Sequence, residues 1–233
     1  MFVGHLAVAF ASKRASPTTS LGWFVAAGTT ADLLWPVFLL VGIERVSIVP
    51  HAMAFNSLVF DSYPWSHSLL MLMVWGVLLA VFAHWCGVAR TGAVFIAILV
   101  VSHWLLDYIT HAPDMPLWPG SSPRLGLSLW NSTAGTLAIE GMLWVGGLAV
   151  YLRQRRPRGW PGVVLLWSLV VICTVMWAAG PWTPPPPSAR SLAWFALAGW
   201  IIVPWAAWAD HYYVPRSDAG SADYPAPAMV SQP

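Results

Sequence analysis

The chain has 233 residues, of which 58% are hydrophobic and 9% are charged, and its formal net charge is +2. Soluble domains carry about 25% charged residues, so this composition excludes an ordinary soluble domain and indicates an integral membrane protein whose partner is the lipid bilayer. The small net charge gives no basic surface, so we expect no nucleic-acid partner. Protein partners leave no signal in the sequence.

Residues 1–12 are apolar, but they are too few to cross a bilayer, which takes about 20 residues of helix. Lys13 and Arg14 follow directly and would hold the end of this segment at a membrane surface. We therefore expect a short N-terminal helix that is re-entrant or interfacial. The re-entrant arrangement is favoured, because it brings His5 to a depth similar to that of Asp32 in the next apolar run.

Longer apolar runs predict an all-α, polytopic membrane protein with about six transmembrane helices. In the first of them, Pro36 lies four residues after Asp32 and removes the backbone hydrogen bond that the Asp32 carbonyl would accept. The predicted spans are about 21–43, 68–86, 90–109, 133–152, 161–180 and 191–209.

The polar residues divide the chain into three parts. A membrane-embedded core over 1–152 carries the candidate site, whereas the two additional spans within 153–213 contain no ionisable group. We expect these two helices to face lipid or to support the core. The tail 214–233 is Pro, Ala and Ser with little to pack, and it is predicted to be disordered.

The basic residues predict the orientation of the spans. With six spans both termini lie on one side, and that side would hold eight Lys and Arg residues against three on the other. The positive-inside rule then places both termini in the cytoplasm, in a multi-pass protein of the cell membrane. The eight are Lys13, Arg14, Arg90, Arg153, Arg155, Arg156, Arg158 and Arg216, and the three are Arg45, Arg124 and Arg190.

The third apolar run ends in a polar motif. His103, Asp107 and His111 follow one another at four-residue spacing, which places them on one face of a helix. Pro113 ends that helix just beyond. The motif could be a helix end with a few polar residues at the membrane surface. A functional site is favoured, because ionisable groups at membrane depth are costly and usually serve a purpose.

With this topology the candidate site residues converge in the outer half of the membrane. Imidazole and carboxylate groups suit zinc, iron or manganese, and no thiolate is available to them. We expect a divalent metal, with zinc favoured, and the number of ions, one or two, stays open. The candidate metal ligands are His5, Asp32, His67, His103, Asp107 and His111, and Asp107 and Glu140 are the candidate catalytic carboxylates.

Other polar residues receive simpler interpretations. Glu44 and Arg45 are adjacent and are predicted to form an ion pair at the membrane interface. His84 falls at the inner end of the second span, away from the candidate site, and is predicted to be structural.

The ordered motifs resemble a family of membrane-bound metal-dependent hydrolases, often called the YdjM-like or LexA-binding inner-membrane hydrolases. The resemblance covers about 1–152, and it implies that His5, Asp32, His67, His103 and Asp107 are metal ligands, whereas His111 and Glu140 match less closely. It also implies a distant similarity to zinc-dependent phospholipase C and P1-type nucleases. The motifs are Gly4-His5, Thr30 to Pro36, Tyr63 to Leu69, Ser102 to Asp107, and Gly126 to Ser132 with Glu140.

Two functions follow as hypotheses. The first is a membrane-bound hydrolase in which a metal-activated water attacks a phosphoester, a lipid being one such substrate. The second is a non-catalytic membrane protein, either a metal or proton carrier or a scaffold that binds a partner and keeps a structural metal. A carrier should have polar groups through the whole membrane depth, and the inner half of the predicted spans is nearly bare.

Overall fold

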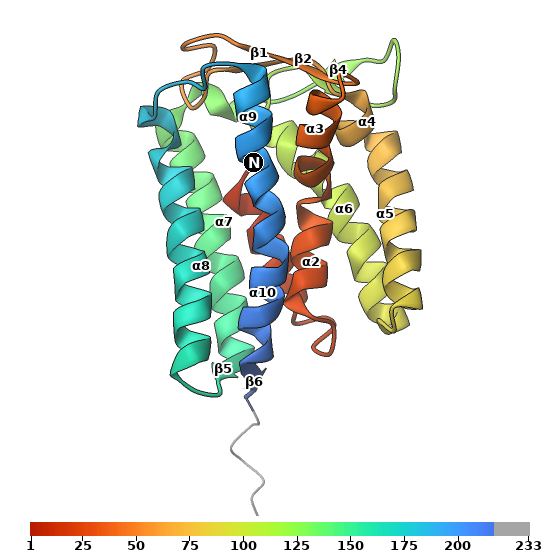
Figure 1. Cartoon of the computed structure of the whole chain (residues 1–233), viewed down its shortest axis with the longest axis vertical. Coiled ribbons are helices and arrows are strands. Elements are labelled where there is room, and N and C mark those ends of the chain that lie inside the picture. Colours follow the sequence, from red (N-terminus) through yellow and green to blue (C-terminus); the bar gives the residue numbers. More distant parts are fainter. Residues whose placement is uncertain (217–233) are drawn as a thin grey trace, which may run out of the picture.

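The computed structural model describes residues 1–216, which fold into a bundle of helices closed at each end by short paired strands (Figure 1). Residues 217–233, nearly all of the tail predicted to be disordered, lie outside the described part. The first two residues of that tail, 214 and 215, belong to the short strand Tyr213–Pro215.

Short strands lie in the connections between the helices and, in one case, directly after the last helix. The two-stranded pairs are all antiparallel: β1 (Arg45–Ile48) with β2 (Leu58–Ser62), β3 (Met115–Pro116) with β4 (Arg124–Leu125), and β5 (Arg155–Pro157) with β6 (Tyr213–Pro215). The helices are α1 (Val3–Ser12), α2 (Leu21–Gly28), α3 (Thr30–Leu40), α4 (Pro64–His67), α5 (Leu69–Trp85), α6 (Arg90–Thr110), α7 (Thr133–Gln154), α8 (Trp160–Ala179), α9 (Ala189–Ala196) and α10 (Ile202–His211).

The prediction of six transmembrane helices is wrong. Within residues 1–216, four helical stretches are long and apolar enough to cross a membrane, and a fifth is reached only if the bent pair α2 and α3 counts as one span. The second predicted span, α5, has 17 residues. At a rise of 1.5 Å per residue it is about 26 Å long, short of the about 30 Å hydrocarbon core. The four are Arg90–Thr110, Thr133–Gln154, Trp160–Trp182 and Ala189–His211.

The first predicted span is broken at Thr29 rather than weakened at Pro36. Helices α2 and α3 meet there at an angle of 55°. The hydroxyl groups of Thr29 and Thr30 each donate to a backbone carbonyl four residues earlier, at 2.7 Å, an arrangement that often bends helices. The break frees the carbonyl of Gly28 and places Asp32 in the first turn of α3.

The N-terminal helix lies inside the bundle (Figure 1). It packs mainly against α7 and α2, and its residues from Val3 to Ala7 are all buried. Two glycines make this close packing possible. A Cβ atom at Gly147 of α7 would lie 2.2 Å from the Ala7 carbonyl oxygen, and one at Gly28 would lie 2.8 Å from the carbonyl oxygen of His5. Because any larger residue would push α1 away, these glycines place His5 deep in the protein.

The two ends of the bundle differ in charge. The β1–β2 and β3–β4 pairs lie at one end, and the β5–β6 pair lies at the other, beside the ends of α7 and α10 (Figure 1). At the β5–β6 end, Lys13 binds Asp210 at 2.6 Å and Arg155 donates to the Pro17 carbonyl. The eight basic residues counted above belong to this end and the other three to the opposite end.

Candidate metal centre

Asp107, in the last turns of α6, lies at the centre of a buried group of histidines. Its Oδ1 atom also contacts the amino group of Met1. The structure thus brings together residues from α1, α4 and α6 that lie up to 106 positions apart in the chain. Four imidazole Nε2 atoms lie within 3.9 Å of the Asp107 carboxylate: those of His5 (3.0 Å), His103 (3.1 Å), His111 (3.7 Å) and His67 (3.9 Å).

A second carboxylate, that of Asp32, lies near two of these histidines. Its Oδ1 atom lies 3.7 Å from Nε2 of His67 and 3.9 Å from Nε2 of His103. The side chain of Asp32 is 40% exposed, whereas that of Asp107 is 2% exposed. One carboxylate of the cluster is therefore buried and the other is partly exposed.

The ligand atoms form two overlapping groups. In one, His5, His103 and Asp107 each offer an atom within 4.8 Å of the others; in the second, Asp32, His67 and His103 do the same. His103 belongs to both. Either group offers two imidazoles and one carboxylate, which is a known ligand set for catalytic zinc and leaves a position for water.

Hydrogen bonds to Nδ1 orient several of the imidazoles so that Nε2, the other ring nitrogen, faces the cluster. His103 is the first case. Nδ1 of His103 lies 2.8 Å from the Gly28 carbonyl oxygen that the break between α2 and α3 set free. A carbonyl can only accept, so Nδ1 carries the proton and Nε2 presents a lone pair. Metal-binding histidines are commonly held by such contacts, which fix the tautomer and the ring orientation.

His67 is oriented through a serine. Its Nδ1 atom lies 2.6 Å from Oγ of Ser66, and Ser66 donates to Oε2 of Glu44, also at 2.6 Å. Glu44 further accepts from the backbone N–H groups of Trp65 and Ser66, at 2.8 Å each. Because the serine proton points to the carboxylate, its oxygen accepts from His67 Nδ1, and Nε2 of His67 presents a lone pair to Asp32 and Asp107.

Glu44 is thus a buried anchor for His67 rather than half of a surface ion pair. Within residues 1–216 it forms no ion pair with Arg45, so that prediction is wrong. Burial raises the pKa of the Glu44 carboxyl, and its three hydrogen-bond donors act in the opposite direction. The contact to Ser66 spans 22 positions in the chain, so no short-range pattern could have revealed it.

His111, the residue that caps the C-terminal end of α6, is held at its Nδ1 atom by Asp114 and Tyr63. Nδ1 lies 3.0 Å from Oδ1 of Asp114, and the Tyr63 hydroxyl donates to the same oxygen at 2.5 Å. Burial raises the pKa of Tyr63 well above its ordinary value, so the phenol stays protonated and acts as a donor. His111 therefore also presents Nε2 to Asp107, although it belongs to neither of the two ligand groups.

The polar atoms that lack partners show that these residues fit a metal ion. Within residues 1–216, Nε2 of His103 and Nδ1 of His5 are buried without a hydrogen-bond partner, and the two rings stack in parallel at 3.6 Å. Buried polar atoms in folded proteins are rarely left unsatisfied. An unpartnered Nε2 lone pair beside two carboxylates is the arrangement that a divalent cation satisfies.

Glu140 on α7 lies apart from the two ligand groups. Its Oε2 atom accepts from the backbone N–H of Phe2 at 3.0 Å, whereas Oε1 is buried without a partner in the described chain. Both Glu140 and Asp107 line the same cavity. Glu140 is thus placed beside the cluster rather than among its ligands.

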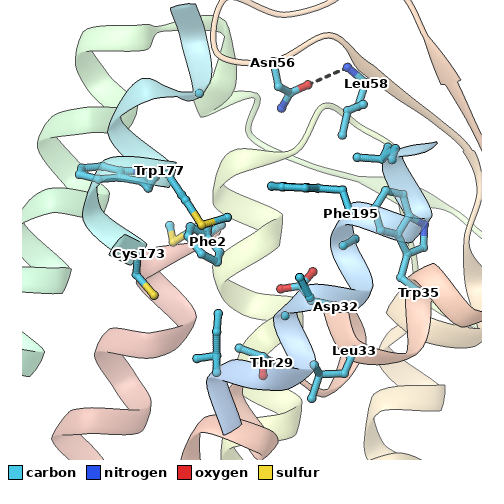
Figure 2. A pocket seen from close by; sticks show the side chains of 18 of the residues that line it. Phe2, Thr29, Asp32, Leu33, Trp35, Asn56, Leu58, Cys173, Trp177 and Phe195 are labelled. Carbon is cyan, nitrogen blue, oxygen red and sulfur yellow. Dashed lines mark hydrogen bonds between the residues drawn. The ribbon is translucent and has the colours of Figure 1, made fainter. Parts of the chain in front are cut away.

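The cavity beside the cluster has a volume of about 580 Å³. In Figure 2 the carboxylate of Asp32 points into a space bounded by Cys173 and Trp177 of α8 and by Phe195 of α9. The two additional spans therefore do more than support the core, because their apolar faces form much of the cavity wall. Sequence reasoning missed this, since apolar residues that line a cavity look like residues that face lipid.

A membrane-embedded helical bundle with a buried group of histidines and aspartates that could hold a metal ion is the class of protein that this fold and site define. The chain belongs to the YdjM inner membrane protein family, whose model matches residues 1–181. The family match includes α8, so it is longer than the resemblance noted in the sequence, which covered about 1–152. No curated protein and no solved structure matches the chain.

Proposed function

We propose that the chain is a metal-dependent hydrolase of the inner membrane that cleaves a phosphoester. The observation that supports this most directly is the pair of overlapping ligand groups, built from His5, Asp32, His67, His103 and Asp107, at the side of a cavity. A lipid is the phosphoester that the membrane location favours. Zinc is the metal that the imidazole and carboxylate donors favour.

Each group of the site has a separate proposed role. His67, His103 and Asp32 would hold an ion at the cavity, while Asp107 and His5 complete the ligand set or hold a second ion behind it. A bound divalent ion supplies a Lewis acid and a water molecule of lowered pKa. Glu140, with one free carboxylate oxygen beside this site, would accept the proton that the attacking water loses.

The exposure of Asp32 favours this proposal over a scaffold with a structural metal. Structural zinc sites are closed, with all four positions taken by protein ligands. Here one carboxylate of the cluster is 40% exposed and borders a cavity large enough for a ligand, which is typical of an open, catalytic site.

The orientation is also a proposal: the β5–β6 end faces the cytoplasm. That end carries the eight basic residues, and the positive-inside rule places such an end in the cytoplasm. The candidate centre would then open toward the outer half of the membrane. Reporter fusions after Gly120 and after Arg156 should report opposite sides, and a cytoplasmic signal from Gly120 would reverse the orientation.

The experiment that tests the function combines metal analysis with a hydrolysis screen. The purified protein should contain a divalent metal and release phosphate or alcohol from phosphoester substrates. His67→Ala should lose both properties, and His84→Ala is the matched control, because His84 is exposed and the one hydrogen bond of its side chain within residues 1–216 is to the Val88 carbonyl, at 3.0 Å. Equal metal content in the two variants would refute the proposed site, and metal without hydrolysis of any phosphoester would leave the structural-metal scaffold as the better reading.

A further inference from the structure

The cavity beside the candidate metal centre is lined by the apolar faces of two helical segments. On α8 the lining residues recur at helical spacing, and so do those on α9 and the turn that follows it, residues 197–201. Residues three, four and seven apart lie on one side of a helix, so each helix turns a continuous apolar stripe toward the cavity. The stripes are Leu169, Ile172, Cys173, Met176 and Trp177 on α8, and Leu192, Phe195, Ala196 and Gly199 on the C-terminal helices.

Three tryptophans of the cavity wall have indole nitrogens without a hydrogen-bond partner among residues 1–216. They are Trp35, Trp130 and Trp177, and their indole nitrogens are buried. Their side chains are at most 9% exposed. No Lys or Arg of the described chain lines this space. The phosphate of a ligand would therefore depend on a metal ion as its positive partner rather than on Lys or Arg side chains.

We propose that the cavity binds an amphiphilic phosphoester, with its hydrocarbon chain between α8 and α9 and its phosphate beside Asp32 and His67. The position of the phosphate rests on the proposed function, because Asp32 and Asp107 would repel it without a cation between them. The position of the chain does not, since it depends only on the apolar stripes. A volume of about 580 Å³ falls within the range of about 300–1,000 Å³ found for ligand pockets.

One wall of this chain-binding region lies outside the family match. Leu192, Phe195 and Gly199 follow residue 181, where the match to the family model ends. The catalytic groups belong to the matched part, so the selection of the hydrocarbon chain would be made by an element outside it. Phe195 and Gly199 are therefore the residues expected to set the accepted chain length.

A photoactivatable probe tests the proposal without turnover. Dodecyl phosphate carrying a diazirine at the end of its chain is added to the purified full-length protein in nanodiscs, and the labelled residues are mapped by peptide mass spectrometry. We expect labelling of the α8 and α9 stripes, and competition by unlabelled dodecyl phosphate. Labelling confined to outward residues such as Val171 and Val175, or unaffected by the competitor, would overturn the proposal.

Two glycine substitutions provide matched variants. A Cβ atom at Gly199 would meet only Leu33, at 3.9 Å, so Gly199→Leu fills the cavity without a clash in the backbone. Gly146→Leu adds the same side chain on α7, where no atom of residues 1–216 lies within 4 Å of the added Cβ. Gly199→Leu should reduce labelling at least about tenfold and Gly146→Leu should not. Equal labelling would contradict the proposal, and Trp177→Phe, which replaces the indole of the α8 stripe with a smaller ring, tests the same cavity if Gly199→Leu fails to fold.

The metal requirement separates this proposal from the proposed function. Labelling is measured with and without a chelator, and metal content and hydrolysis are measured on the same preparations. Stripe labelling without bound metal or hydrolysis would support chain binding and refute the hydrolase. Metal binding and hydrolysis of water-soluble phosphoesters, with no stripe labelling, would support the hydrolase and refute chain binding.

Discussion

The molecule contains two buried polar clusters of opposite character. Near the β5–β6 end, Asp210 accepts from Lys13 at 2.6 Å, from the backbone N–H of Leu21 at 3.0 Å and from the Tyr151 hydroxyl at 2.9 Å. Around Asp107, by contrast, nitrogen atoms of His5 and His103 are buried without a hydrogen-bond partner in the described part of the chain. The polar atoms of the first cluster find their hydrogen-bond partners within the protein. The second cluster leaves imidazole nitrogens that a bound metal ion could satisfy.

This difference separates a structural role from a functional one. The Lys13–Asp210 pair joins α10 to the end of α1, and Tyr151 adds α7, so the pair fixes three helices at one end of the bundle. Burial lowers the pKa of Lys13, and the nearby Asp210 carboxylate acts in the opposite direction. The Asp107 cluster borders a cavity and carries unused lone pairs, as a ligand-binding site requires.

The largest expected effect comes from Asp107→Asn. The amide keeps the size of the side chain but loses the charge that faces four imidazoles, so we expect no measurable bound metal and no hydrolysis. Metal analysis and the phosphoester assay check this result. Metal at the wild-type stoichiometry in this variant would mean that the Asp107 cluster, like the Asp210 cluster, is structural.

Glu140→Gln should have the next largest effect. The substitution removes the proposed proton acceptor while it retains the contact to the backbone N–H of Phe2. Removal of a general base typically lowers the rate by about 10²–10⁴-fold. We expect kcat to fall by such a factor with the metal content unchanged. A loss of metal together with activity would instead identify Glu140 as a ligand.

Asp210→Asn tests the structural role of the Asp210 cluster. It leaves the Lys13 ammonium buried without its counter-charge, and breaking a buried pair in this way costs about 3–5 kcal/mol. The melting temperature of the purified protein should fall, while metal stoichiometry at low temperature stays that of the wild type. The double variant with Lys13→Met should recover part of the loss, because the unpaired charge is removed. Loss of metal in Asp210→Asn at a temperature where it is folded would contradict a purely structural role.

The sequence predicted the helices best where long apolar runs end at strong signals. The bounds of α6, α7 and α8 agree with the predicted spans to within a few residues, because Arg90, Ser132 and Gly159 begin runs of 20 or more residues. The bend at Thr29 was not predicted, since a hydrophobicity pattern cannot show where a threonine hydroxyl competes with the helix backbone. That bend and the short α5 account for the overestimate of six spans.

The cluster itself was predictable because ionisable residues in apolar runs are few. His5, Asp32, His67, His103 and Asp107 were all candidates, and the structure brings their side chains together. Their role as metal ligands stays a prediction. The supporting groups could not be found in the same way: Lys13 and Asp210 are 197 positions apart, and Glu44 reaches His67 only through Ser66. Such contacts depend on the folded geometry and leave no spacing in the sequence.

The smallest expected effect concerns one of these supporting groups. Ser66→Ala removes the hydroxyl between Glu44 and His67, so nothing holds the proton on Nδ1 of His67, and the ring can turn or change tautomer. Loss of a contact that orients a metal-binding histidine typically weakens metal affinity by about 10–100-fold. A competition titration with a chromophoric chelator should therefore show weaker binding in this range, and excess metal should restore hydrolysis.

Ser102→Ala is the control for this change. Ser102 precedes His103 on α6, but its hydroxyl donates to the Leu99 carbonyl, at 2.7 Å, and forms no hydrogen bond with an imidazole of residues 1–216. Its removal should leave the affinity unchanged. If Ser66→Ala also binds metal as the wild type does, His67 is either oriented by the cluster alone or is not a ligand, and His67→Ala distinguishes the two. Because the Asp210 cluster contains no histidine, only the Asp107 cluster should respond to a change in imidazole orientation, and this is the sharpest difference between them.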